Sequence, residues 1–454
     1  MTKRRFVVIG GDAAGMSAAS LARRRDPDLE IEAYEMGSYT SYGACGMPYY
    51  VSGEVPELDD LVVVTPGEFE QERGIKVFLR HRVERIIPQE NLIEALNLET
   101  GQVRRAPYDE LLIATGAEPI VPPDLDTSLP GVFTLRGLAD AGSLKAWIKK
   151  HERREAVVVG TGYIGLEMAE ALTLAGLKVT LIGRRPRVMP TFEEEISAAA
   201  AEELTRHEVQ VRTGAEAGRA EIRSDGRLAL SLTDGETLTA DLILVGAGVN
   251  PRSRLAQEAG LDLGEKKAIK VDQSQKTSHP HIWAAGDCAE AYHLLRQNNA
   301  YVPLALTANR QGRVVGFNVT GGSARFPGIL GSAVCKVFDL AVARTGLGLK
   351  EAQSQGLDAV KVMVTSRSRP HYYPGSAPVR TVLIVERKTN KLWGAQMAGT
   401  DGVAPRINTW AAALAAGFSL EQVYNLDLAY APPFSPVWDP VLISAEVAMK
   451  QIKG

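Results

Sequence analysis

The stretch Arg5-Phe6-Val7-Val8-Ile9-Gly10-Gly11-Asp12-Ala13-Ala14-Gly15 decides the fold of this chain. Its apolar residues 6–9 predict a strand, its glycines predict a tight turn, and the small residues of 16–25 predict a helix. A second predicted strand, 30–34, ends at Glu35, which lies 20 residues beyond Gly15. That spacing is typical of the acidic residue that binds an adenosine ribose, so the stretch predicts a dinucleotide-binding unit.

A second unit of the same kind begins about 150 residues later. A predicted strand, 156–159, leads into Gly160-Thr161-Gly162-Tyr163-Ile164-Gly165, a predicted helix over 166–175 and a strand over 178–182. Glycines in such turns let backbone N–H groups approach a pyrophosphate at the helix N-terminus. Two turns, each between a strand and a helix, predict two bound dinucleotides.

Length and composition limit the class of protein. The chain has 454 residues, of which 45% are hydrophobic and 23% charged. The length corresponds to about three domains of roughly 150 residues each, and the composition is that of an ordinary globular protein. Lys and Arg number 51 against 54 Asp and Glu, a net charge of −3, so we expect no nucleic-acid partner. No apolar run approaches about 18 residues, so we expect no membrane span.

Cysteine is rare in the sequence. Cys45, Cys288 and Cys335 are the three cysteines, with no Cys-x-x-Cys pair among them. This count excludes a disulfide scaffold and a cysteine-based zinc site, and we expect no metal. The N-terminal residues lack a secretory apolar region, which together with the few cysteines favours a reducing cytoplasmic location.

Further segments repeat around the two units. Ala114-Thr115-Gly116 follows a predicted strand at 111–113, Gly248 ends a similar pattern that begins at 241, and a strand at 281–285 leads to Asp287. From about residue 331 the pattern changes to alternating strands and a helix, which predicts an α+β terminal domain. The strands are expected at 333–338, 379–386 and 392–397, and the helix at 407–416.

The order of these motifs resembles the flavin-dependent pyridine nucleotide–disulfide oxidoreductases along essentially the whole chain. The finer resemblance is to their single-cysteine branch, because Ser41-Tyr42-Gly43-Ala44-Cys45-Gly46 offers one cysteine where two-cysteine relatives carry Cys-x4-Cys. That branch contains coenzyme A-disulfide reductases, NADH oxidases, NADH peroxidases and NAD(P)H sulfur or polysulfide reductases.

The resemblance implies an α/β fold with two Rossmann-like domains and a C-terminal α+β dimerisation domain. Residues 1–120 and 245–325 would form the FAD-binding domain, 121–244 the NAD(P)-binding domain, and 326–454 the dimerisation domain. It implies FAD and NADPH or NADH as cofactors. The implied cofactor-binding residues are Gly10, Gly11, Ala13, Ala14, Gly15, Glu35, Ser41, Ala114, Thr115, Gly116, Gly160, Gly162, Tyr163, Ile164, Gly165, Gly183, Arg184, Arg185, Gly248, Asp287, Thr307 and Phe434.

Cys45 is the expected redox centre. It precedes a predicted helix, whose N-terminus would lower the thiol pKa and favour the thiolate that attacks a disulfide. Tyr372 and Tyr430 complete the implied catalytic set by donating a hydrogen bond or a proton to the departing thiolate. Cys288 and Cys335 are interpreted as buried hydrophobic residues.

Three features favour a disulfide reductase within the branch. Oxidases and peroxidases usually carry histidine where this chain has Ala13. The segments His371-Tyr372-Tyr373-Pro374-Gly375 and Tyr430-Ala431-Pro432-Pro433-Phe434 resemble those of coenzyme A-disulfide reductases. Two alternatives remain open: an NAD(P)H oxidase or peroxidase acting through a Cys45 sulfenic acid, and a non-catalytic flavoprotein electron carrier or NAD(P)H sensor.

The substrate-binding positions agree only in part with that pattern. Ala44 stands where the reductases often have asparagine, and Trp438 where they tend to have a lysine able to pair with a coenzyme A phosphate. The positions that remain polar or basic, and that we expect to bind substrate, are Ser17, Arg24, Ser41, Arg73 and Asn309. The expected substrate is coenzyme A disulfide, or a smaller persulfide or polysulfide.

Residues after the second unit bear on the nicotinamide cofactor. In NAD-binding units the second strand ends with Asp or Glu. In this chain it ends at Gly183, which is followed by Arg184, Arg185 and Arg187. A missing carboxylate and nearby guanidinium groups favour NADPH over NADH. In the family an aromatic residue at the position of Tyr163 covers the flavin until the nicotinamide arrives.

The C-terminal motif predicts a homodimer. Pro432-Pro433 is expected to hold an extended backbone suited to an arm over a partner subunit, and flanking aromatic residues are typical of interfaces. In the family this motif reaches the flavin and cysteine of the other subunit, so Tyr430 would serve the partner's Cys45.

Overall fold

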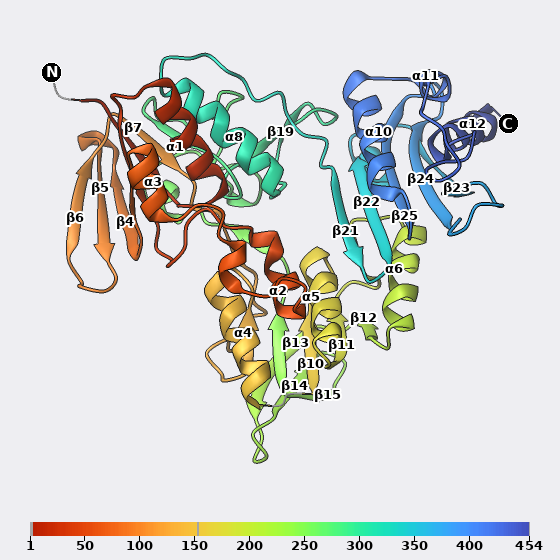
Figure 1. Ribbon diagram of the computed structural model, residues 1–454, viewed down its shortest axis with the longest axis horizontal. Coiled ribbons are helices and arrows are strands. Elements are labelled where there is room, and N and C mark those ends of the chain that lie inside the picture. Colours follow the sequence, from red (N-terminus) through yellow and green to blue (C-terminus); the bar gives the residue numbers. More distant parts are fainter. Residues whose placement is uncertain (1–2, 152–153, 454) are drawn as a thin grey trace.

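The computed structural model describes residues 3–151 and 154–453. Figure 1 shows three parts: one of red and orange segments together with the teal helix α8, a yellow-green central part, and a blue C-terminal part. A five-stranded parallel sheet lies in each of the first two parts, and a five-stranded antiparallel sheet lies in the third. The α/β fold class expected from the sequence is confirmed.

The first parallel sheet has the order β18-β7-β1-β2-β3. At its centre, Val8 pairs with Ala33 on one side and with Leu112 on the other. The last strand in sequence joins the edge beside β7, which brings a segment near residue 283 next to the first half of the chain. The strands are β1 (Arg5–Ile9), β2 (Glu30–Tyr34), β3 (Ile75–Phe78), β7 (Glu110–Ile113) and β18 (Ile282–Ala284).

Two long helices, α1 (Ala13–Arg25) and α8 (Ala305–Asn318), pack together beside this sheet. Glycines in α8 make the close approach possible. A methyl group at Gly312 would lie 2.2 Å from the Ala14 carbonyl oxygen, and one at Gly316 would lie 2.4 Å from the Ala18 carbonyl oxygen. These backbones therefore touch without intervening side chains.

The second parallel sheet repeats the order of the first as β12-β11-β10-β16-β9, with one change of connection. Its edge strand β9 comes before the unit in sequence, whereas the equivalent β18 comes long after the first unit. The strands are β9 (Val132–Thr134), β10 (Glu155–Val159), β11 (Lys178–Gly183), β12 (Gln210–Thr213) and β16 (Leu242–Val245). The helices are α4 (Leu138–His151), α5 (Tyr163–Leu174) and α6 (Glu194–Arg206).

Each parallel sheet is accompanied by a three-stranded antiparallel sheet that the sequence analysis did not predict. Both insertions come directly before the fourth strand of their unit, β7 or β16. The internal repeat is therefore longer than the glycine turns alone indicate. The strands are β4 (His81–Ile87), β5 (Leu92–Asn97) and β6 (Val103–Pro107), and β13 (Ala217–Ile222), β14 (Leu228–Leu232) and β15 (Thr237–Ala240).

The C-terminal part is the predicted α+β domain. Its antiparallel sheet has the order β21-β22-β25-β24-β23, and buried Trp410 of α10 and Val441 of α12 belong to its core. The strands are β21 (Ala333–Val337), β22 (Leu340–Gly346), β23 (Ala359–Arg367), β24 (Pro378–Glu386) and β25 (Leu392–Gly399), and the main helices are α10 (Val403–Ala416), α11 (Leu420–Tyr424) and α12 (Pro440–Lys453).

Helix α6 connects the second part to the third by packing against the C-terminal sheet (Figure 1). Polar contacts accompany this packing. The buried guanidinium of Arg344 donates to the Thr191 carbonyl oxygen at 2.7 Å, and Lys361 lies 2.7 Å from Glu195. Among the described residues, no helix is long and apolar enough to cross a bilayer.

Candidate active site

Cys45 lies in a short 3-10 turn, Ala44–Gly46, immediately before helix α2 (Met47–Ser52). The turn and the helix agree with the predicted helix start. Its side chain is exposed, whereas Cys288 and Cys335 are buried. Cys45 is therefore the one cysteine of the sequence that a dissolved disulfide can reach.

The environment of the Cys45 thiol opposes ionisation in the protein alone. Partial burial raises the pKa of this thiol, and the carboxylates of Glu167, Asp287 and Asp12 raise it further. The sequence analysis predicted a lowered pKa, and this prediction was wrong for the ligand-free chain. The helix that follows has only six residues, so its dipole is weak beside burial and three nearby carboxylates.

The first glycine turn has the shape of a dinucleotide cradle. A methyl group at Gly10, where φ is +112°, would lie 2.1 Å from the Ala114 carbonyl oxygen, and one at Gly15 would lie 2.0 Å from the Gly10 oxygen. No side chain caps the N-terminus of α1, where Ala13 and Ala14 begin the helix. The first-turn N–H groups are thus available to a pyrophosphate.

Two acidic residues, Glu35 and Asp287, belong to this cradle. The Glu35 carboxylate accepts hydrogen bonds from the Gly11 N–H at 2.8 Å and the Gly37 N–H at 2.6 Å, which holds it at the glycine turn. Asp287 has no hydrogen-bond partner among the described residues, and burial raises its pKa to about 6. A half-buried carboxylate without a partner is costly, so Asp287 fits the hydroxyl groups of a bound FAD.

The remaining residues predicted for this site line the same strand ends. The Thr115 hydroxyl donates to the Arg252 carbonyl oxygen at 2.6 Å, and the Ser41 N–H donates to the Gly11 carbonyl oxygen at 2.9 Å. Thr307 is buried in α8. Gly116 and Gly248 have φ of +69° and +115°, values that favour glycine.

The second glycine turn repeats the first in detail. A methyl group at Gly160 would lie 2.2 Å from the Gly246 oxygen, and one at Gly165 would lie 1.8 Å from the Gly160 oxygen. Gly162 faces open space, and it begins α5 without a side-chain cap. Tyr163 and Ile164 follow as the first residues of α5, and the Tyr163 ring packs edge-on against Phe192 with ring centroids 5.9 Å apart.

The basic residues after β11 are exposed. Gly183 is the last residue of β11, and a methyl group there would lie 2.6 Å from the Thr161 side chain. Arg184 lies 3.9 Å from Glu216, whereas Arg185 has no ion pair among the described residues. Arg185 is thus the arginine freest to meet a phosphate.

The two predicted catalytic tyrosines meet each other although 58 residues separate them in sequence. The two hydroxyl groups interact closely enough for Tyr372 to raise the pKa of Tyr430, and the side chains are 64% and 45% exposed. Within one chain they make no described interaction with Cys45. Phe434 beside them is 76% exposed.

The backbone that carries these residues differs from the prediction of an extended arm. Pro432-Pro433-Phe434 forms a turn in which the Phe434 N–H donates to the Ala431 carbonyl oxygen at 2.9 Å. The fixed φ of proline suits such a turn as well as an extended segment, and the hydrogen bond decides between them.

The predicted substrate residues lie on α1, α8 and the helix α3 (Pro66–Arg73). The Ser17 hydroxyl donates to Asn309 Oδ1 at 2.6 Å, and Arg73 donates to the Ser20 hydroxyl at 3.1 Å. Arg24 is exposed on α1. Ser17 and Asn309 thus bridge the seam between α1 and α8, whereas Arg73 reaches α1 from α3.

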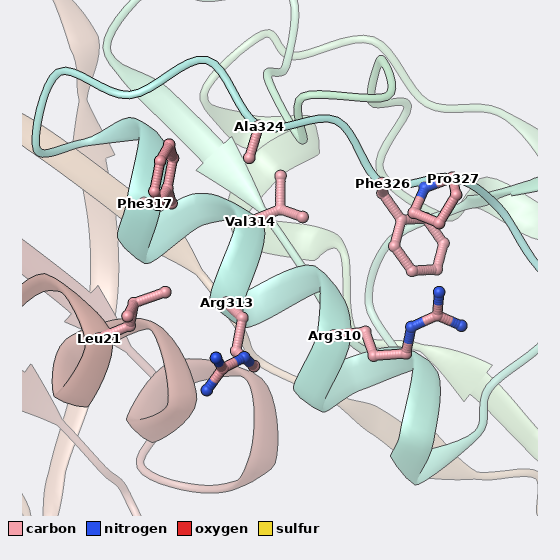
Figure 2. A pocket seen from close by; sticks show the side chains of 8 residues that line it. All are labelled: Leu21, Arg310, Arg313, Val314, Phe317, Ala324, Phe326 and Pro327. Atoms are coloured by element: carbon pink, nitrogen blue, oxygen red, sulfur yellow. The ribbon is translucent and has the colours of Figure 1, made fainter.

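A shallow pocket of about 280 Å³ lies farther along this seam (Figure 2). Figure 2 shows Arg310, Arg313 and Phe317 projecting from one face of α8, with Phe326 above Arg310 and Leu21 contributed by α1. Cys45 does not line this pocket, which is basic and apolar but not the site of the reactive thiol.

Two acidic residues near Cys45 were not predicted from the sequence. Asp12 accepts a hydrogen bond from the Tyr42 N–H at 3.2 Å, and burial raises its pKa to about 6. Glu167 lies on α5, and burial together with Glu170 raises its pKa to about 7. Glu167 could have been predicted from the sequence, because it lies four residues after Tyr163 and therefore on the same helical face.

Comparison with known proteins agrees with this geometry. The family described as pyridine nucleotide-disulphide oxidoreductase matches residues 4–312, and the corresponding dimerisation domain matches residues 332–440. The chain belongs to the pyridine nucleotide-disulphide oxidoreductase family. As a member of this family it is an FAD-dependent NAD(P)H oxidoreductase.

Individual members of the pyridine nucleotide-disulphide oxidoreductase family match along nearly the whole chain. A relative from Pyrococcus furiosus named NAD(P)H sulfur oxidoreductase (CoA-dependent) is 38% identical, over 98% of this chain and 99% of its own. An NAD-dependent persulfide reductase from A. fulgidus is 38% identical, with a TM-score of 0.96 over 99% of this chain and 84% of its own. Reduced CoADR-RHD from Bacillus anthracis is 35% identical, with a TM-score of 0.96 over 100% of this chain and 81% of its own.

Relatives at 28–32% identity divide between proteins named NADH oxidase and proteins named coenzyme A disulfide reductase. The names of these relatives therefore do not distinguish oxygen from a disulfide as the electron acceptor.

Proposed function

We propose that this protein uses NAD(P)H to reduce coenzyme A disulfide or coenzyme A persulfide through Cys45. The observation that carries the proposal is the single exposed thiol at the start of α2, with both other cysteines buried. With no second cysteine beside it, Cys45 must take its disulfide partner from the substrate. The names of the relatives from Pyrococcus furiosus and A. fulgidus support a sulfur acceptor of this kind.

In the proposed reaction the Cys45 thiolate attacks one sulfur of the substrate. The substrate S–S bond breaks, Cys45 forms a mixed disulfide, and the departing thiolate takes a proton. FAD, when bound, supplies the two-electron transfer from NAD(P)H that reduces the mixed disulfide. The balanced result is two thiols from a disulfide, or one thiol and hydrogen sulfide from a persulfide, for each NAD(P)H and proton consumed.

We propose that the cradle around Gly10, Gly15, Glu35 and Asp287 binds FAD. The unpaired Asp287 carboxylate and the uncapped start of α1 support this assignment. The equivalent cradle at Gly160 and α5 would bind NAD(P)H, with the domain ranges inferred from the sequence. An exposed Arg185 at the end of β11 supports a preference for NADPH.

We propose that coenzyme A binds along the seam between α1 and α8. Ser17 and Asn309 lie together there, and Arg24 and Arg73 make no ion pair among the described residues. Unpaired guanidinium groups suit the phosphates of coenzyme A. Trp438, which replaces the expected lysine, is 55% exposed and stacks on Tyr424 with ring centroids 5.7 Å apart.

The group that donates a proton to the departing thiolate would come from a second copy of the chain. The exposed, neighbouring tyrosines Tyr372 and Tyr430 make no described interaction with a thiol of their own subunit. A match to the dimerisation domain over 332–440 supports a homodimer in which this pair faces the other subunit's thiol.

The acceptor is tested by anaerobic NAD(P)H consumption with coenzyme A disulfide, glutathione disulfide, polysulfide and peroxide. We expect the coenzyme A compounds to be preferred, and Cys45→Ser to retain FAD but to lose their reduction, because serine forms no mixed disulfide. Cys335→Ser serves as the matched control and should stay active. Preference for peroxide, or substantial turnover of coenzyme A disulfide by Cys45→Ser, would contradict the proposal.

A further inference from the structure

Three potential metal-ligating side chains converge where helix α6 meets the β21–β22 turn. Glu203 lies in the last turn of α6, and His207 follows the end of that helix. Their spacing of four residues places both on one helical face. Asp339 comes from the two-residue turn between β21 and β22, and its backbone N–H donates to Glu203 Oε1 at 3.3 Å. The ligand atoms of all three side chains lie within 4.8 Å of one another.

The imidazole and the carboxylate face each other without a hydrogen bond. Glu203 is only 1% exposed. His207 Nε2 is a buried atom that lies 3.3 Å from Glu203 Oε1, yet it has no hydrogen-bond partner among the described residues. The nitrogen and the oxygen lie at ion-pair distance, an arrangement that is favourable only when a proton or a cation lies between them.

Neighbouring groups hold the ligands in place, and Glu203 Oε1, which accepts the Asp339 N–H at 3.3 Å, keeps a second lone pair for a cation. The Arg206 guanidinium lies 2.7 Å from Glu203 Oε2, which is the other oxygen of that carboxylate. The His207 ring stacks on Phe338, with ring centroids 3.9 Å apart and planes inclined by 6°. Stacking fixes the direction of the imidazole, which is the kind of support that metal-binding histidines require.

We propose that Glu203, His207 and Asp339 bind one divalent cation of the zinc class. One imidazole nitrogen and two carboxylate oxygens match the ligands that Zn²⁺ takes at about 2.0–2.2 Å, which requires ligand atoms roughly 3.3–3.5 Å apart in a tetrahedron. The 3.3 Å separation of Nε2 and Oε1 already meets that requirement. Asp339 is exposed and reaches the position by a side-chain rotation, which leaves the fourth position to water.

The site would join two parts of the molecule. Glu203 and His207 belong to the second part, and Asp339 belongs to the C-terminal sheet. A bound cation would therefore stabilise the docking of α6 on that sheet, in addition to the Arg344 and Lys361 contacts. The proposed role is structural, because the cluster includes none of the residues assigned to the reaction.

The experiment uses the FAD-loaded protein, freed of metal by a chelator and then titrated with Zn²⁺ alone. His207→Phe removes Nε2 but keeps a ring to stack on Phe338. Asp339→Asn alters an exposed ligand and keeps the backbone hydrogen bond to Glu203. His281→Phe is the matched control, because this histidine also lies near a glutamate, 4.0 Å from Glu110, but outside the cluster.

We expect one Zn²⁺ more per wild-type chain than per His207→Phe chain, and a Zn²⁺-dependent rise in melting temperature that His207→Phe lacks. The site's affinity should fall by about 100-fold in His207→Phe and about tenfold in Asp339→Asn, with no change in His281→Phe. Zn²⁺ held by Cys45 would be equal in all four proteins, so the difference in stoichiometry reports this cluster.

Equal stoichiometry in the wild type and His207→Phe would overturn the proposal. Should His207→Phe fail to fold, unchanged affinity in Asp339→Asn would overturn it too.

Discussion

At the scale of single residues, the position of Cys45 beside carboxylates affects its reactivity. Glu167 is the carboxylate with the largest effect on the thiol, and its own pKa of about 7 means that its charge changes near neutral pH. Glu167 is half-buried, so water screens its interaction with the thiol less than it would between two exposed groups. The thiol and the carboxyl therefore titrate as interacting groups.

Glu167→Gln is predicted to make Cys45 ionise at lower pH. The substitution removes a negative charge that disfavours the thiolate, so the pKa of the thiol must fall. In the reduced, flavin-free protein, the rate of Cys45 alkylation by iodoacetamide measured against pH should shift to lower pH. Glu54→Gln is the control, since this exposed carboxylate lies near α2 but does not affect the thiol. An identical pH profile for Glu167→Gln and the wild type would refute the prediction.

Arg185→Ala is predicted to weaken the use of NADPH selectively. Loss of one guanidinium–phosphate contact should lower kcat/KM for NADPH by about tenfold and leave that for NADH within about twofold. Steady-state kinetics with both cofactors measure this ratio. Arg219→Ala, at another exposed arginine of the same part, should change neither value. This test is cleaner than a substitution at Gly183, whose new side chain would meet Thr161. Equal losses for both cofactors would show that Arg185 does not contact the 2′-phosphate.

At the scale of elements, the α1–α8 contact holds the start of α1 where the FAD cradle needs it. Gly312 and Gly316 lie one turn apart on α8, and each meets a carbonyl oxygen of α1. A side chain at either position must push the two helices apart, because a backbone oxygen cannot rotate away as a side chain can.

Gly316→Ala is predicted to destabilise the protein by about 1–3 kcal/mol and to reduce FAD retention, because the new methyl group would lie 2.4 Å from the Ala18 oxygen. Thermal unfolding and the flavin content of the purified protein measure both effects. Gly67→Ala in α3 is the control, with no atom nearer than 4.0 Å, and should keep or raise the stability by up to about 1 kcal/mol. Unchanged stability and flavin content in Gly316→Ala would show that the helices separate without cost.

At the scale of the whole molecule, the exposed Tyr372, Tyr430 and Phe434 need a second subunit to complete the proposed site. A Cys45→Ser chain mixed with a Tyr430→Phe chain tests this arrangement after subunit exchange. Each parent dimer has two impaired sites, whereas the mixed dimer has one site with both residues intact. With complete exchange, half of the dimers are mixed, so activity should reach about one quarter of the wild-type value and exceed both parents. No rise despite demonstrated exchange would contradict a site shared between subunits.

The sequence by itself determined the local units of this protein. The apolar runs before Gly10 and Gly160 are strands, and the uncapped helices after them begin at these turns, because strand period, glycine conformation and helix start are encoded within about 15 residues. Cys45 could be singled out by its place before a helix. Ser17 and Asn309 could be paired only through the resemblance to a known family.

The tertiary structure alone decided the electrostatics and the long-range neighbours. Partial burial raises the pKa of the Cys45 thiol, against the shift expected from the helix start. Glu167, 122 residues away in sequence, adds to this rise because packing of α5 against α2 brings its charge near the thiol. The meeting of Glu203 with Asp339, 136 residues apart in sequence, likewise depends on a partner that no local pattern specifies. Burial and charge act through space, so they depend on which surfaces pack together and not on distance along the chain.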